Sequence, residues 1–139
     1  MTTGTAGSSA RQYHTAQVHY LRQDVVYTDN GKVFTMGTIP AGSQILQPIS
    51  GVYVNTVFNW GTNNRIDIGT SSNDDLYGTD IALGTKAFVA LDEAATATDV
   101  NAWYVSSDTT ITCTPDLTGT TGGTGSAVVV IAYIPPNAT

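Results

Sequence analysis

Hydrophobic and polar residues alternate along the chain in short runs, which is the pattern of β-strands. In residues 65–69 the two isoleucines face one way and the charged residues face the other. Residues 52–58 are rich in β-branched and aromatic side chains, and residues 126–134 are apolar at nearly every position. A strand that is apolar on both faces is typical of a position buried between two layers. We therefore expect the last of these runs to form a central strand.

The remaining runs predict a protein built from strands. Turn signals separate them at 29–32, 40–42 and 61–64, with a polar loop at 70–80 and a Gly/Thr-rich hairpin loop at 117–126. Pro48 and Ser50-Gly51 interrupt the β-rich stretch of residues 44–59. Further strands are expected in residues 13–27 (a helix over 13–23 being a weaker alternative), 33–38, 44–59, 86–91 (or a short helix), 103–105 and 109–114. About eight strands without a long helix predict a β-sandwich or barrel, with a jelly roll among the options.

The 139 residues suffice for one domain. Residues 1–9 are almost all Thr, Gly, Ala and Ser after the first Met, so they cannot form a core. We expect an extended or flexible N-terminal arm over residues 1–22 and a single sandwich domain over residues 23–139. The beginning of the sequence does not resemble a secretion signal, and no run approaches the length of a membrane-spanning helix.

Composition and charge narrow the function. Charged residues make up only 12% of the chain, whereas it contains 23 Thr and 14 Gly, which suit pleated strands and tight turns. The net charge is −6, with five basic residues against eleven acidic ones. Binding to nucleic acid or to an anionic membrane needs a basic patch, so neither partner is expected.

No catalytic arrangement emerges, and we predict that the protein is not an enzyme. The Gly-x-Ser-x-Gly motif is absent, and at strand spacing His14 and His19 point to opposite faces. The only glutamate, Glu93, directly follows Asp92, and these two carboxylates are expected to be an exposed pair rather than the acid and base of a glycoside hydrolase. The single cysteine, Cys113, lies in a strand-like run and is expected to be a buried, inert thiol.

Hard oxygen ligands cluster around residues 67–80. Asp74, Asp75 and Asp80, together with Asp67, offer groups that suit Ca²⁺, but the spacing of an EF-hand loop is absent. Asp and Asn also favour loops for backbone reasons, and this interpretation is preferred. We predict no metal and no cofactor, and whether these aspartates bind Ca²⁺ stays open.

Three stretches, residues 37–45, 52–70 and 127–137, resemble the small head decoration, or capsid cement, proteins of tailed bacteriophages. They contain a strand that ends in Pro-Ala-Gly, a strand followed by an Asn/Gly turn and an alternating Ile strand, and an apolar strand that ends in Pro-Pro. The resemblance implies a jelly-roll-like domain on the outer surface of an icosahedral capsid. It also implies synthesis in the host bacterial cytoplasm, no catalytic residues, and a homodimer or homotrimer that bridges neighbouring major capsid protein subunits.

The resemblance also suggests contact residues. The N-terminal segment of such proteins often contacts the shell, which here points to Arg11, Tyr13, His14, His19, Tyr20 and Arg22. The turn after residue 58 offers candidates for oligomer or surface contact: Trp60, Asn63, Asn64 and Arg65. An alternative function is a carbohydrate-binding or receptor-binding module on the phage head, suggested by Trp60, Tyr77 and the Asp74-Asp75 loop. A tryptophan at the end of a strand can also simply cap the core.

Overall fold

The computed structural model describes residues 17–91 and 103–136. Within these ranges the chain forms β-strands and the short 3₁₀ helix η2, but no α-helix. The elements are β1 (His19–Val26), β2 (Phe34–Ile39), β3 (Gln44–Ile45), η2 (Gln47–Ile49), β4 (Gly51–Thr56), β5 (Asn63–Gly69), β6 (Gly78–Ala82), β7 (Phe88–Ala90), β8 (Thr109–Thr118) and β9 (Ser126–Ile134). No helix in this part of the chain is long and apolar enough to cross a membrane.

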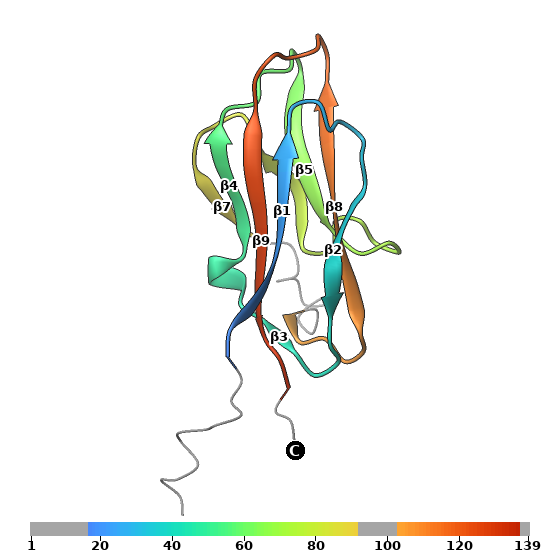
Figure 1. Ribbon diagram of the computed structural model, residues 1–139. Helices are drawn as coiled ribbons and strands as arrows, with labels where there is room; N and C mark the ends of the chain where they lie inside the picture. Colours follow the sequence, from blue (N-terminus) through green and yellow to red (C-terminus); the bar gives the residue numbers. More distant parts are fainter. Residues whose placement is uncertain (1–16, 92–102, 137–139) are drawn as a thin grey trace, which may run out of the picture.

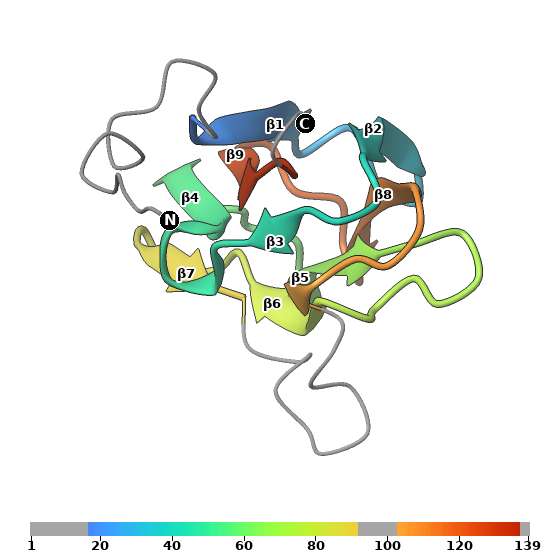
Figure 2. The ribbon, with the colours of Figure 1, turned by 90° about the horizontal axis from the view of Figure 1, so that it is seen from below.

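The strands form two antiparallel sheets packed face to face (Figures 1 and 2). Sheet A has the order β1-β9-β4-β7, and β3 also pairs with β9; sheet B has the order β2-β8-β5-β6. Tyr133 of β9 pairs with His19 on one side and with Ile45 on the other, so β3 and β4 follow each other along the same edge of β9. Counted as one interrupted strand, they give eight strands in two four-stranded sheets. This is the arrangement of a jelly roll, and it confirms the predicted fold class.

The interruption between β3 and β4 is closed by a buried serine. Residues 46–50 leave the edge of β9 through η2, which contains Pro48. The Ser50 Oγ donates to the carbonyl oxygen of Leu46 at 2.8 Å and accepts a hydrogen bond from the amide of Ala132 at 2.8 Å. The predicted break at Pro48 and Ser50 is confirmed, because proline offers no N–H to the ladder. Ser50 supplies the acceptor that the missing strand residue leaves open.

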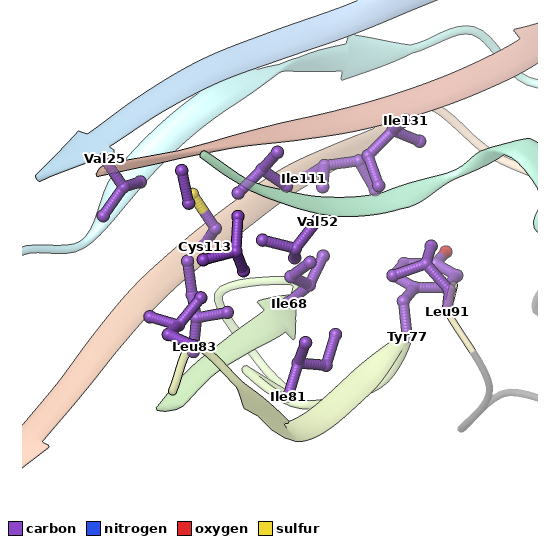
Figure 3. Close-up of a cluster of buried hydrophobic side chains, with 14 of the residues drawn as sticks. Val25, Val52, Ile68, Tyr77, Ile81, Leu83, Leu91, Ile111, Cys113 and Ile131 are labelled. Carbon is purple, nitrogen blue, oxygen red and sulfur yellow. The ribbon is translucent and has the colours of Figure 1, made fainter. Parts of the chain in front are cut away.

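The core lies between the two sheets (Figure 3). Sheet A contributes Val25, Val52 and Ile131, and sheet B contributes Ile111 and Cys113, all with no exposed surface. The prediction that Cys113 is buried is confirmed, and burial raises the pKa of its thiol to about 12. The thiol therefore stays protonated at physiological pH.

The turn at residues 29–32 joins β1 of sheet A to β2 of sheet B. The amide of Val26 donates to Asp29 Oδ2 at 2.9 Å, and Lys32 Nζ donates to Asp29 Oδ1 at 2.8 Å. Burial of Asp29 acts to raise the pKa of its carboxyl group, but the two hydrogen bonds and the charge of Lys32 outweigh burial and hold that pKa below its ordinary value. Gly31 has a φ of +76°, a conformation that glycine adopts without strain.

The loop between β8 and β9 also crosses from one sheet to the other. Residues 117–126 were predicted to form a hairpin loop, but β8 and β9 lie in different sheets and are not paired with each other. Gly125 has a φ of +147°, and a Cβ atom there would come within 2.6 Å of the Phe58 ring. A glycine at this position lets the loop pass close over the end of the core.

Other differences from the sequence interpretation are local. β6 begins at Gly78, inside the predicted 70–80 loop, and residues 86–91 contain a strand rather than a helix. Residues 103–105 were expected to be a strand but form only one isolated bridge, between Tyr104 and Gln44. β1 begins at His19, within the range predicted as an arm, and pairs with β9 from that residue onward. Residues 1–16 of the predicted arm lie outside the described residues.

The prediction that β9 is buried on both faces is wrong. Val129 and Ile131 point into the core with no exposed surface, whereas Val128 and Val130 lie half-buried on the outside of sheet A. The strand is central within its sheet, but of the residues on its outer face only Ala132 is buried. The pattern of apolar positions tells which residues avoid water and does not tell which molecule covers them.

Candidate interaction surfaces

The predicted shell-contact residues that the structure describes lie on β1, at the edge of sheet A. Tyr20 and Arg22 point outward, and Tyr20 is 65% exposed. The Arg22 guanidinium forms an ion pair with Asp24 at 3.2 Å on the same face. His19 lies at the start of the strand, with its ring 5.7 Å from the ring of Tyr133. Arg11, Tyr13 and His14 are outside the described residues.

The second group of candidates lies at the turn between β4 and β5. The Trp60 amide donates to the side-chain oxygen of Asn64 at 2.8 Å, and the Asn64 amide group donates back to the Trp60 carbonyl at 3.0 Å. The indole N–H of Trp60 donates to the carbonyl oxygen of Tyr27 at 3.1 Å, and its ring packs on the core. These bonds fix the positions of Trp60 and Asn64 in the turn, and Asn63 lies beside them, half-buried.

The last member of that group, Arg65, points away from the core. It forms an ion pair with Asp80 at 3.0 Å, in which both side chains are partly exposed. The ion pair lies on sheet B, so the structure separates Arg65 from the β1 candidates by the thickness of the sandwich.

The acidic residues of the 67–80 region do not converge on a metal site. In the part of the chain that the structure describes, no three His, Cys, Asp or Glu side chains are placed to share an ion. Burial, followed by the negative charges of Asp80, Asp74 and Asp75, raises the pKa of the Asp67 carboxyl group, although a hydrogen bond from the Asp80 amide at 2.7 Å acts to lower it. Asp67 is thus used as an acceptor for a backbone turn.

A groove of about 490 Å³ lies beside the 70–77 loop, between it and residues 104–110. It is lined mainly by hydroxyl groups, including those of Ser71, Ser72, Ser106 and Ser107. The exposed ring at its rim is that of Tyr104, which is 55% exposed. The ring of Tyr77, a residue suggested for sugar stacking, is buried, with only 2% exposed.

The outer faces of the two sheets differ in chemistry. In sheet B, threonines alternate with the core residues of β8, and the hydroxyl groups of Thr38 and Thr110 lie 2.9 Å apart. In sheet A, the corresponding outward positions of β9 are filled by Val128, Val130 and Ile134. One outer face is therefore suited to water, and the other is apolar.

Comparison with protein-family models and with curated proteins gives no match. Three solved structures share the fold. A chain in the capsid asymmetric unit of cyanophage Pam1 matches with a TM-score of 0.62 and 15% identity, over 90% of this chain and 89% of that one. A chain in the capsid of Ralstonia phage GP4 matches with a TM-score of 0.57 and 12% identity, over 91% and 90%.

The third match is to a chain in the acid-stable capsid of Helicobacter pylori bacteriophage KHP30, with a TM-score of 0.56 and 12% identity, over 88% of this chain and 91% of that one. At such identities the likeness is one of fold. The chain therefore has a β-sandwich fold that also occurs, over almost the whole length of the matched chain, in the capsids of three phages.

Proposed function

We propose that the protein is a structural component of a phage virion that binds the outer surface of an icosahedral capsid. In this role it stabilises the shell by bridging neighbouring major capsid protein subunits, and it acts as a homo-oligomer without catalytic activity. The observation that carries the proposal is the likeness in fold to chains of three phage capsids.

The extent of the likeness supports an accessory role. About nine-tenths of each matched chain is covered by about nine-tenths of this one, so each of those capsids contains a separate chain of similar length. A small sandwich of this kind can attach at many equivalent positions on a shell. Repeated modest contacts then add up to firm attachment.

The shell-binding candidates are the N-terminal residues with His19, Tyr20 and Arg22 at the start of β1. An extended segment that becomes ordered on a partner can reach further than a compact domain, at the cost of ordering it. In the oligomer, the candidates for contact with another copy or surface are Trp60, Asn63, Asn64 and Arg65, at the turn before β5 and the start of that strand.

The test uses the purified full chain and heads of its phage that lack it. Binding is measured by co-sedimentation, and the heat resistance of the heads is compared with and without the protein. The combined variant Arg11→Ala/Tyr13→Ala/His14→Ala should lose binding, whereas Lys86→Ala, an exposed cation between β6 and β7, should bind like the wild type. Absence of wild-type binding at about 10 µM would overturn the proposal, because a lattice-bound protein needs at least micromolar affinity.

A glycan-binding role is the second candidate, and the hydroxyl-lined groove beside Tyr104 is the observation that favours it. An accessible aromatic ring beside polar groups is the usual platform for a sugar. A glycan array with the wild type and with Tyr104→Ala tests this role. Binding that requires Tyr104 supports it, and an empty array removes it.

A further inference from the structure

The outer face of sheet A is an ordered array of apolar side chains that the described chain leaves uncovered. Of the nine large hydrophobic residues that are exposed in the described ranges, five lie on this face or at its β1 end: Val18, Tyr20, Val26, Tyr53 and Phe88. Val128 and Val130 of the central strand continue the array between them. We call this surface the sheet A face.

The sheet A face is as large as the largest apolar patch of a typical monomer, a patch that is often functional. From their exposed fractions, the five side chains present on the order of 500 Å² of apolar surface, taking about 150–250 Å² for a whole aromatic side chain. The largest apolar patch on a typical monomer is about 300–600 Å² and is often functional. A homodimer interface of standard size buries about 800 Å² per partner, of which about 65% is apolar, so the areas agree.

Two rows of residues cross the strands of this face, as the register shows. In the first row, Phe88 of β7 pairs with Tyr53 of β4, and Tyr53 pairs with Val128 of β9. The two aromatic rings of this row lie 4.5 Å apart and form a ridge. On the β1 side the row ends at Asp24, which pairs with Val128.

The second row carries small residues on β7 and β4, where the first row carries aromatic ones. Ala90 of β7 pairs with Gly51 of β4, Gly51 pairs with Val130 of β9, and the row ends on β1 at Arg22. Gly51 cannot carry a larger side chain, because a Cβ atom there would meet the backbone of Val89. A ridge of two aromatic rings therefore runs alongside a row of small residues, in which Gly51 is buried and Ala90 is half-buried.

The two rows are complementary to each other. A two-fold axis that runs across the strands between the rows places the first row of one copy over the second row of the other. Tyr53 and Phe88 then face Gly51 and Ala90 of the second copy, and the relation is repeated in reverse. Face-to-face packing of two sheets tolerates the angle of about 30° that sheet twist introduces.

The charges of the face obey the same symmetry. Arg22 ends the second row and Asp24 ends the first, so the axis places each Arg22 opposite Asp24 of the second copy. The chain as a whole carries −6, whereas Arg22 and Asp24 cancel on this face. This pair therefore adds no net charge to the repulsion between two copies of an acidic chain that meet here.

We propose that two copies of this chain form a dimer through their sheet A faces, with the two-fold axis between the Tyr53 row and the Gly51 row. The dimer rests on the proposed function, because it specifies how the proposed virion protein associates with itself. In the dimer, Tyr20 and Arg22 contact the second copy rather than the shell. It also explains why β9 is apolar on both faces, because the second copy supplies the covering layer that the chain itself lacks.

The first test measures the oligomeric state of the full chain by sedimentation velocity at about 1–100 µM, the range in which an interface of moderate affinity dissociates. Arg22→Asp and Asp24→Arg each place like charges across the axis, and each should weaken the dimer about tenfold or more. An equimolar mixture of the two variants restores opposite charges and should dimerise again. Both side chains are exposed, so neither substitution disturbs the core.

The second test concerns the ridge. Tyr53→Ser should weaken the dimer, whereas Tyr104→Ser, at an exposed tyrosine that lines the groove beside the 70–77 loop, should leave it unchanged. A wild type that is monomeric or trimeric at about 100 µM overturns the proposal. So does a charge-swapped mixture that associates no better than its components.

Neither test contains capsids, so the two proposals fail separately. A dimer that does not bind heads contradicts the proposed function alone. A monomer that binds heads, and loses that binding in Arg22→Asp, contradicts the dimer alone and assigns the sheet A face to the shell.

Discussion

Replacing Ser50 with alanine tests how the interrupted edge of sheet A is held together. The Ser50 hydroxyl is buried and is the acceptor for the amide of Ala132, as well as a donor to the carbonyl of Leu46. Alanine removes both bonds. The Leu46 carbonyl retains a bond from the amide of Ile49 at 3.3 Å, whereas the Ala132 amide loses the acceptor that Ser50 supplied. We expect Ser50→Ala to leave one buried backbone donor unsatisfied.

The magnitude follows from that one donor. An unsatisfied buried group costs about 1–3 kcal/mol of the free energy of unfolding, and the lost bond to Leu46 adds about 0.5–1 kcal/mol. We therefore expect Ser50→Ala to lose about 2–3 kcal/mol, which for a domain of this size lowers Tm by roughly 6–12 °C. In urea the midpoint should fall by about 1 M or slightly more, with the slope unchanged.

Ser43 provides a matched control. It is also a serine without exposed surface, but within the described chain its Oγ has no hydrogen-bond partner. Removing an unpartnered buried hydroxyl relieves a desolvation penalty, so Ser43→Ala should be neutral or stabilising by up to about 1 kcal/mol. Urea denaturation followed by tryptophan fluorescence compares the two variants. If both lose the same free energy within about 0.5 kcal/mol, the hydrogen bonds of Ser50 are not what stabilises this edge.

Three further outcomes can be measured. Asp29→Asn should lower the free energy of unfolding by about 1 kcal/mol at pH 7, a value that allows for the solvent exposure of the Lys32 ammonium group. Because the pKa of Asp29 in the folded protein lies below 3.8, the carboxylate contributes its full stabilisation above pH 3.8. Unfolding measured at decreasing pH should therefore show the difference between the two proteins shrinking below that pH. Cys113 should not react with Ellman's reagent in the native protein at pH 8 and should react fully in guanidinium, and rapid native labelling would contradict its burial. Gly125→Ala should lower Tm strongly, because its Cβ would collide with Phe58, whereas Gly123→Ala, with open space around it, should not. Equal shifts in Tm would contradict the close approach of the loop to Phe58.

Much of the fold could be predicted because local chemistry agrees with the final structure. The residues of β9 were predicted to their end points, since nine consecutive positions without a turn residue leave little choice. The alternation in residues 65–69 places Ile66 and Ile68 in the core as expected, both without exposed surface. Pro48 and Ser50 interrupt the strand where the sequence indicated, because the missing N–H is a property of proline itself.

The pairing of strands could not be predicted in the same way. Nothing in residues 117–126 distinguishes a hairpin loop from a connection between sheets, because both use the same turn residues. Trp103 illustrates a second difficulty. Its neighbours in the sequence favour a strand, but its ring packs against that of Tyr77, with the ring centres 5.7 Å apart, and this contact between distant residues is not visible in the local pattern. The candidate surface was missed for a related reason, since Gly51 and Ala90 become neighbours in one row of small residues only once β4 and β7 are paired.

The position of β9 has a consequence for biosynthesis. This strand pairs with β1, β3 and β4, so sheet A lacks its central strand until residue 134 has left the ribosome. β1 and β9 are separated by about a hundred residues, and such distant pairings close slowly. The strands made first must wait with their apolar positions exposed, as folding intermediates of β-rich chains do. The sandwich therefore cannot close before β9 has been made, and removing β9 should leave a product that aggregates instead of a smaller sandwich.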